Sequence, residues 1–137
     1  EFEPKSHKTD IAQALKFLSS TQKKKAIVFV ISDFISEDYE HTLKIASKKH
    51  DITGIRVYDI REEKMPNLGM VSMLDAETGE THLINTGSKS VRINYEKYYQ
   101  EKLKYFKETF SNSGAGVVNT RVDESYVTKL LGYFKSR

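Results

Sequence analysis

The stretch Ala26-Ile-Val-Phe-Val-Ile31, with Ser32 and Asp33 directly after it, decides the fold. Such a continuous run of apolar, mostly β-branched and aromatic residues is typical of a strand buried on both faces, as in a parallel sheet covered by helices. It is far too short to cross a bilayer. We therefore expect an α/β protein built around this strand.

The segments on either side of this strand predict helices. Before it, Thr9 is expected to cap a helix that ends near residues 20–22 and carries its apolar side chains on one face. After it, Ser36 is expected to open a second helix with Tyr39, Leu43 and Ala46 directed inward. Residues 52–58 form the next predicted strand, so the order helix, strand, helix, strand implies a right-handed parallel crossover.

The remainder of the chain adds a hairpin and a second crossover. Residues 70–74 and 81–84 flank Glu77-Thr-Gly-Glu80, which predicts an inserted β-hairpin. A long helix is expected over residues 90–112, ended by Gly114, with an apolar stripe made of Val91, Tyr95, Tyr98, Leu103, Phe106 and Phe110. Residues 116–122 predict a third parallel strand. Residues 123–125 are then expected to cap a last helix, whose inward residues are Tyr126, Val127, Leu130, Leu131 and Phe134.

Composition sets broad limits on the function. The 137 residues suit one domain over 1–137, with 38% hydrophobic and 30% charged residues, as in soluble globular proteins. There is no cysteine, which excludes thiol nucleophiles and thiolate metal sites and fits a reducing compartment. We expect a cytoplasmic protein without a membrane segment.

The net charge of +3 comes from the N-terminal end, where Lys23, Lys24 and Lys25 follow the first predicted helix. Cations complement the dipole at a helix end and keep the entry to an apolar strand soluble. A phosphate-binding patch over residues 5–25 is the alternative, but nucleic-acid surfaces normally form a broader basic stripe. We therefore do not expect a nucleic-acid partner.

The strand at 26–31 has the composition of a central strand, yet only two further parallel strands and a hairpin are available to surround it. An apolar edge strand is an aggregation hazard that proteins cover or pair. We expect either that a strand N-terminal to residue 1 lies beside it or that a second copy of the chain covers it by self-association.

Three carboxylates follow the three predicted parallel strands: Asp33, Asp59 and Asp123. Open α/β sheets bind ligands at this edge, and oxygen ligands without cysteine favour Mg²⁺ or Mn²⁺. The alternative for Asp33 and Asp123 is that they only accept hydrogen bonds from amides at the starts of the following helices.

The charged segment Asp59-Ile-Arg-Glu-Glu63 has two interpretations. Asp59, Arg61 and Glu62 are candidate partner-binding residues, or the segment is a self-paired, solvated turn. Glu62-Glu63-Lys64 also matches the short E-x-K pattern of metal-dependent nucleases. The four histidines have no zinc spacing and are expected on the surface, and no nucleophile, base and orienting group assemble in the sequence.

Four segments read together resemble the bacterial domain-of-unknown-function fifty-eight family, which has a von Willebrand factor A-like (vWA) domain. They are Lys8-Thr-Asp-Ile-Ala-Gln-Ala-Leu15, Ile27-Val-Phe-Val-Ile-Ser-Asp-Phe34, Val57-Tyr-Asp-Ile-Arg-Glu-Glu63 and Asp123-Glu-Ser-Tyr-Val127. The resemblance implies a three-layer, Rossmann-like vWA-type fold whose N-terminal strand or strands precede residue 1.

The same resemblance implies a metal-ion-dependent adhesion site, in which Thr9 and Asp33 match family ligands. The family's first ligand motif, Asp-x-Ser-x-Ser, is absent from this chain, so the site is incomplete. Similar proteins are associated with MoxR-type AAA+ ATPases in protein assembly or chaperone-like recruitment. We expect a non-enzymatic protein-interaction domain without catalytic residues. The alternative is a Mg²⁺-dependent hydrolase or nuclease that uses Asp33, Asp59 and Glu62.

Overall fold

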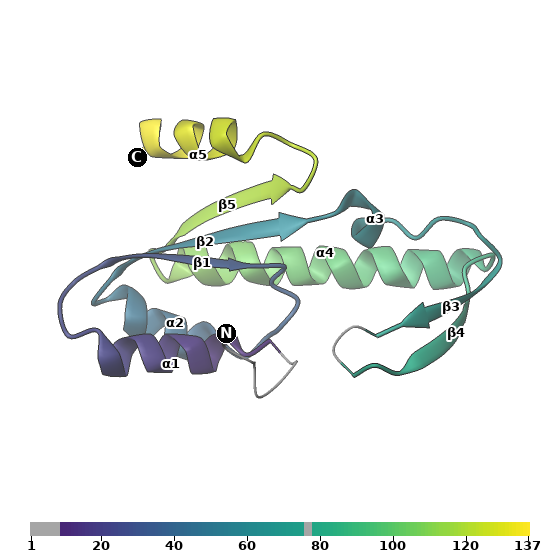
Figure 1. Ribbon diagram of the computed structural model, residues 1–137, viewed down its shortest axis with the longest axis horizontal. Helices are drawn as coiled ribbons and strands as arrows, with labels where there is room; N and C mark the ends of the chain where they lie inside the picture. Colours follow the sequence, from purple (N-terminus) through teal and green to yellow (C-terminus); the bar gives the residue numbers. More distant parts are fainter. Residues whose placement is uncertain (1–8, 76–77) are drawn as a thin grey trace, which may run out of the picture.

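The computed structural model describes residues 9–75 and 78–137, and it has α/β architecture (Figure 1). Of the residues discussed above, His7, Lys8 and Glu77 lie outside these ranges. The elements follow one another as α1 Ile11–Thr21, β1 Ile27–Ser32, α2 Glu40–Ser47, β2 Asp51–Tyr58, α3 Ile60–Glu63, β3 Met70–Leu74, β4 Thr81–Asn85, α4 Lys89–Asn112, β5 Gly116–Arg121 and α5 Tyr126–Lys135.

The main sheet is parallel, with strand order β1-β2-β5. Gly54 at the middle of β2 pairs with Val30 of β1 on one side and with Val117 of β5 on the other. Strands β3 and β4 form a separate antiparallel hairpin. The predicted mostly parallel sheet with an inserted hairpin is therefore confirmed.

The hydrophobic core lies on one face of this sheet, beneath β1 and β2. Its buried side chains come from α1, α2, β2, α4 and the segment after β1, and they are Ile11, Leu15, Phe34, Tyr39, Leu43, Ala46, Ile52, Phe106 and Phe110. Gly54 allows the helix to approach closely, because a Cβ there would lie 2.5 Å from Phe110 and 2.8 Å from Phe106. Helix α4 runs along the sheet and continues to the hairpin (Figure 1).

Among residues 9–75 and 78–137, only α5 covers the opposite face, and the predicted packing of this helix is wrong. Helix α5 contacts the sheet through Tyr133, whose Oη lies 3.1 Å from Thr53 Oγ1. Ser125 caps the helix as predicted, but none of its residues is buried. Four of the five residues expected to point into a core are exposed instead: Tyr126, Val127, Leu131 and Phe134.

Strand β1 lies at the edge of the sheet, so the expectation that it is buried on both faces is wrong for this chain. Its exposed fractions are 68% for Ile27, 45% for Phe29 and 67% for Ile31. Val28 and Val30, which point to the other face, pack against the core. As expected from the sequence, β1 has the composition of a central strand but too few neighbouring strands to bury it.

Two helix starts differ from the prediction. The N-cap of α1 is Asp10, which accepts a hydrogen bond from Gln13 N at 2.8 Å, rather than Thr9. Helix α2 begins at Glu40 instead of Ser36, because Asp38, in the predicted first turn, has a φ angle of 64°. A helix cannot pass through such a left-handed residue.

Other expectations concern single side chains. On α4, Phe106 and Phe110 are buried as predicted, but Tyr99 rather than Tyr98 joins them. His50 is buried, contrary to the surface position expected for the histidines. Within residues 9–75 and 78–137, no helix is both long and apolar enough to cross a membrane.

Candidate functional site at the carboxyl edge of the sheet

The three predicted aspartates lie at the same edge of the parallel sheet. Asp33 follows β1, Asp59 follows β2, and Asp123 is separated from the end of β5 by one residue. Because β1, β2 and β5 run in parallel, their carboxyl ends share this edge. The contacts of the three side chains nevertheless differ, and these contacts decide what each can bind.

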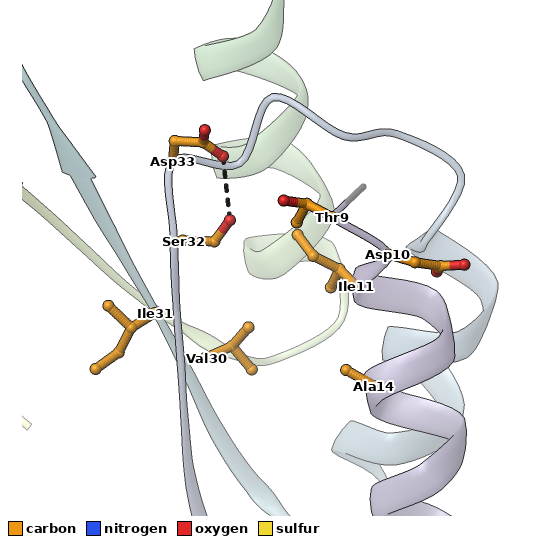
Figure 2. Close-up of a pocket in the computed structure, with 8 residues that line it drawn as sticks. All are labelled: Thr9, Asp10, Ile11, Ala14, Val30, Ile31, Ser32 and Asp33. Atoms are coloured by element: carbon orange, nitrogen blue, oxygen red, sulfur yellow. Dashed lines mark hydrogen bonds between the residues drawn. The ribbon is translucent and has the colours of Figure 1, made fainter. Parts of the chain in front are cut away.

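Asp33 and Thr9 line one open hollow of about 410 Å³ between the start of α1 and the end of β1 (Figure 2). The Thr9 hydroxyl points toward the Ser32 and Asp33 side, whereas Asp10 points away from it. Thus the structure brings together the two residues that the sequence suggested as metal ligands, across the gap between a helix and an edge strand.

The Asp33 carboxylate also stabilises its own turn. Its Oδ1 accepts hydrogen bonds from Ser32 Oγ at 3.2 Å and from Ile35 N at 3.3 Å. Ser32 Oγ in turn accepts a hydrogen bond from Phe34 N at 3.1 Å. In the part of the chain that the structure describes, Asp33 Oδ2 accepts no hydrogen bond, so this oxygen is available to a ligand.

Asp59 and Glu62 form the capping box of α3. Asp59 Oδ1 accepts from Arg61 N at 2.8 Å, and Glu62 Oε2 accepts from Asp59 N at 3.4 Å. This geometry matches the self-paired turn, which was one of the two interpretations of the charged segment. Arg61 is exposed and lines a second hollow of about 260 Å³ beside the hairpin.

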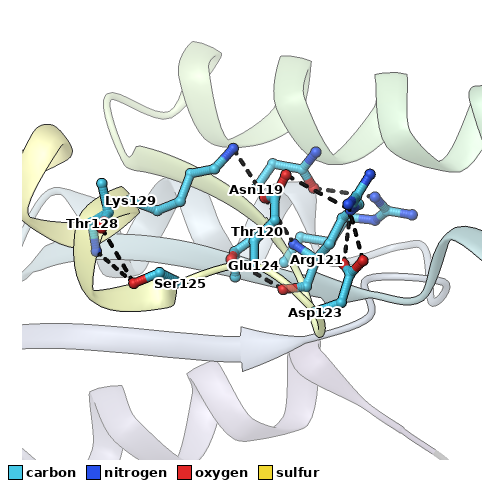
Figure 3. Close-up of polar contacts among 9 residues, drawn as sticks. Asn119, Thr120, Arg121, Asp123, Glu124, Ser125, Thr128 and Lys129 are labelled. Atoms are coloured by element: carbon cyan, nitrogen blue, oxygen red, sulfur yellow. Dashed lines mark hydrogen bonds and ion pairs between the residues drawn. The ribbon is translucent and has the colours of Figure 1, made fainter.

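Asp123 is occupied by a neighbouring arginine (Figure 3). Its two carboxylate oxygens accept from Arg121 Nε at 2.9 Å and Arg121 Nη2 at 3.0 Å. Next to it, Glu124 lies 3.2 Å from Lys129 Nζ, and this hydrogen bond holds the pKa of the Glu124 carboxyl below its usual value. These carboxylates neutralise local cations rather than presenting a free negative charge.

Sequence reasoning missed Arg56, which organises this edge. The residue is 2% exposed and lies on β2 between Ser32 of β1 and Asn119 of β5. Nε donates to the main-chain oxygen of Asp33 at 3.2 Å, and Nη1 donates to Glu63 Oε1 at 3.3 Å and to Asn119 Oδ1 at 3.1 Å. The available signal was an arginine between the apolar residues Ile55 and Val57 of a predicted strand.

By donor count, the described residues do not fit a divalent cation held by this chain alone. They contain no group of three or more His, Asp or Glu side chains that could hold a metal ion. Thr9 and Asp33 supply two side-chain oxygen ligands, with the hydroxyl of Ser32 already committed to the turn. Mg²⁺ keeps its waters unless several oxygens converge, so no step is assigned to a metal here.

Comparison with known protein families shows to which family this chain belongs. The family model described as "Protein of unknown function DUF58" matches residues 1–105 of this chain. The chain belongs to the DUF58 family. The predicted family resemblance is therefore confirmed, while residues 106–137, which contain β5 and α5, lie beyond the matched region.

The mycobacterial proteins that are similar to this chain are described as uncharacterized. One from Mycobacterium avium is 26% identical over 129 residues, covering 93% of this chain and 76% of its own length. One from Mycobacterium tuberculosis is 22% identical over 135 residues, and this chain spans only 42% of that relative's length. A conserved hypothetical protein, BatB from Bacteroides thetaiotaomicron, gives a TM-score of 0.44 at 17% identity, with 93% of this chain and 58% of that one covered.

Proposed function

We propose that this DUF58 chain is a non-enzymatic protein-interaction domain with a vWA-like fold, acting as an accessory of a MoxR-type AAA+ ATPase in protein assembly or chaperone-like recruitment. The observation that carries the proposal is the Asp33 turn, which a buried arginine anchors from behind and which opens onto the hollow shared with Thr9. Family resemblance supplies the class of partner, and the location is cytoplasmic.

The contacts of Asp33 favour binding over chemistry. Its Oδ1 is used by the turn, so only Oδ2 faces a ligand, and one carboxylate oxygen with the Thr9 hydroxyl suits a basic side chain of a partner protein. Arg56 fixes the main chain at Asp33, so little conformational entropy is lost when a partner binds. Arg61, exposed at the same edge, is available to an acidic group.

The hydrolase alternative has less support. It requires Asp33, Asp59 and Glu62 to converge on a metal or a water, whereas Asp59 and Glu62 are engaged with each other's backbone in the capping box. If these two side chains turned toward a metal or a water, the first turn of α3 would lose its capping hydrogen bonds. The interaction function needs no such rearrangement.

The test is binding of the purified chain to a MoxR-type ATPase of the same organism, measured by biolayer interferometry. We expect Asp33→Asn to raise the dissociation constant about tenfold or more, because a charge-assisted hydrogen bond at the interface is lost. Asp123→Asn makes the same chemical change at the same edge and should leave affinity unchanged, because Arg121 already engages that carboxylate.

Three results would contradict the proposal. The first is equal loss of binding in both variants, and the second is no binding of the unmodified chain. The third is metal-dependent turnover of phosphate esters that disappears in Asp33→Ala, which would establish the hydrolase alternative.

A further inference from the structure

We propose that the hollow beside the hairpin binds the carboxyl-terminal residue of a partner protein when that residue is apolar. Its side chain fills the hollow, and its terminal carboxylate pairs with Arg61. The described residues that form the walls all lie within 61–95, so neither Asp33 nor β1 takes part and the inference goes beyond the proposed function. The hairpin lies by the start of α4, far from α1 and α2 (Figure 1).

The first argument is the apolar lining and the size of the hollow. Val71 and Met73 are alternate residues of β3, so they point to the same face of the hairpin. The volume of about 260 Å³ is below the roughly 300–1,000 Å³ of small-molecule sites, and it suits one large side chain. Apart from Arg61 and Thr86, the lining residues are apolar or aromatic: Met65, Pro66, Leu68, Val71, Met73 and Tyr95.

The second argument is that hydrogen bonds fix one wall of the hollow. Thr86 directly follows β4 and is buried. Its Oγ1 accepts a hydrogen bond from Leu68 N at 2.9 Å and donates one to the main-chain oxygen of Gly69 at 2.7 Å. Thr86 N donates to the same oxygen at 2.8 Å. The segment before β3 is thereby tied to the end of β4, so little conformational entropy is lost when a ligand enters.

The third argument is the charge at the rim. Arg61 is exposed, and it is the one charged residue among the described residues that line the hollow. Within residues 9–75 and 78–137 its guanidinium forms no hydrogen bond or ion pair, because the adjacent acids are engaged elsewhere. Glu62 belongs to the capping box of α3, and Glu63 pairs with Arg56 at 3.3 Å. A carboxylate matches a free guanidinium through two parallel hydrogen bonds.

The closeness of the charge to the apolar lining identifies the kind of ligand. Arg61 lines the same hollow as Met65 and Met73, so the apolar group and the carboxylate must be close together on the partner. In an extended peptide, neighbouring side chains point to opposite faces, so an internal acidic residue next to an apolar one would turn one of the two away. A carboxyl-terminal leucine or phenylalanine carries both groups on one Cα.

Methionine methyl signals in nuclear magnetic resonance spectra test the location directly. The chain has three methionines, of which Met65 and Met73 line the hollow and Met70 does not. The probe is a short peptide that ends in leucine with a free carboxylate. We expect saturable shifts of the Met65 and Met73 signals and no shift of the Met70 signal. Unchanged Met65 and Met73 signals at millimolar peptide would overturn the inference.

Three further ligands test the chemistry of recognition. The same peptide with a carboxyl-terminal amide should bind about tenfold more weakly or worse, because it cannot form the charged pair with Arg61. An amidated peptide with an internal aspartate beside leucine should be equally weak. Equal affinity of either peptide and the free acid would overturn the inference. Tighter binding of octanoate than of the free-acid peptide would assign the hollow to a small carboxylic acid and overturn it too.

Two pairs of matched variants test the residues. Arg61→Gln should raise the dissociation constant of the free-acid peptide about tenfold or more, whereas Lys64→Gln removes the same charge outside the hollow and should change it by less than about twofold. Met73→Glu should prevent binding because it places a negative charge in the hollow. Leu74→Glu, on the opposite face of the same strand, should not. Equal effects within either pair would contradict the inference.

Asp33→Asn separates this inference from the proposed function. Asp33 does not line the hollow, so this variant should lose affinity for the ATPase and bind the free-acid peptide as the unmodified chain does. Loss of peptide binding in Asp33→Asn would overturn the assignment to the hollow. Failure of the ATPase to bind the unmodified chain leaves the peptide result standing, so the two proposals fail separately.

Discussion

Arg56 holds Asp33 by its main chain and not by its carboxylate: Nε donates to the Asp33 carbonyl oxygen at 3.2 Å. The two residues are 23 positions apart: Arg56 lies on β2, and Asp33 directly follows the adjacent strand β1. The arginine thereby fixes where the turn after β1 stands and leaves the acidic side chain free to bind. A buried cation thus supports a surface carboxylate without neutralising it.

Replacing Arg56 should destabilise the protein. Arg56→Met leaves Glu63, Asn119 and the Asp33 carbonyl without their donor in a site where the arginine is 2% exposed. We expect a loss of about 2–4 kcal/mol in the free energy of unfolding, measured by urea denaturation. Arg61→Met, on the neighbouring exposed segment, should change stability by less than about 0.5 kcal/mol. Equal effects in the two variants would contradict the role assigned to Arg56.

The two glycines Gly54 and Gly132 should respond to alanine in opposite directions. A Cβ at Gly54 would meet the Phe110 ring at 2.5 Å, so Gly54→Ala should cost about 1–3 kcal/mol through overpacking. Gly132 lies within α5 with nothing within 4 Å of its added Cβ. Gly132→Ala should therefore stabilise by about 0.5–1 kcal/mol, because alanine is the better helix former. Thermal unfolding of both variants checks the two signs.

Tyr39 should make the free energy of unfolding decrease at alkaline pH. Burial, followed by the proximity of Tyr105 and Glu37, raises the pKa of its hydroxyl well above the usual value. The folded state therefore retains a proton that the unfolded chain releases near pH 10. The contribution is fully present below about pH 10 and is lost as pH rises toward the folded-state pKa. The pKa of Tyr99 is raised as well, again mainly by burial.

Tyr39→Phe should reduce this alkaline loss of stability. Its hydroxyl is buried and has no hydrogen-bond partner among residues 9–75 and 78–137. Its removal should also raise the free energy of unfolding at neutral pH by about 1 kcal/mol. Tyr126→Phe, at an exposed site, is the control and should change neither quantity. Urea unfolding at neutral pH and above pH 10 measures both effects.

Divalent cations should not stabilise this chain by itself. A ligand at about one hundred times its dissociation constant would add roughly 2.7 kcal/mol, which is easily seen in a thermal melt. Because Thr9 and Asp33 supply too few oxygens, we expect millimolar Mg²⁺ or Mn²⁺ to leave the melting temperature unchanged. A shift that is present in the chain and lost in Asp33→Ala would show that a metal site forms after all.

The sequence predicted those elements whose signals are local. The hairpin followed from a glycine at its turn, and Gly79 indeed has a φ of 72°. Gly114, expected to end the long helix, has a φ of 70°. The predicted start of α2 was wrong because the sequence does not reveal the left-handed conformation of Asp38. Phe34 is left-handed as well, and its ring lies in the core, 4.1 Å from the Phe106 ring.

The arrangement of the candidate site was less accessible to sequence reasoning, because it depends on register between strands. Strand ends predicted that the three aspartates share an edge, but their availability depends on neighbours such as Arg121 for Asp123. Arg56 meets Asn119 only because β2 and β5 align those two positions. Likewise, the apolar run at β1 indicated a strand correctly, but the prediction that both of its faces are buried was wrong, because burial depends on which strands and helices lie beside it.

Helix α4 connects the hairpin β3–β4 to the hydrophobic core, and its two ends are held by different kinds of interaction. Near its start, Arg92 Nη1 donates to the carbonyl oxygens of Thr86 and Gly87, at 2.6 and 2.9 Å, and so holds the hairpin. Near its end, Phe106 and Phe110 lie fully buried in the core. The two ends of one continuous helix should therefore open with different free energies. We expect amide hydrogens near Arg92 to exchange through local fraying, and those near Phe110 to exchange only through global unfolding. The hairpin should therefore unfold before the main sheet does.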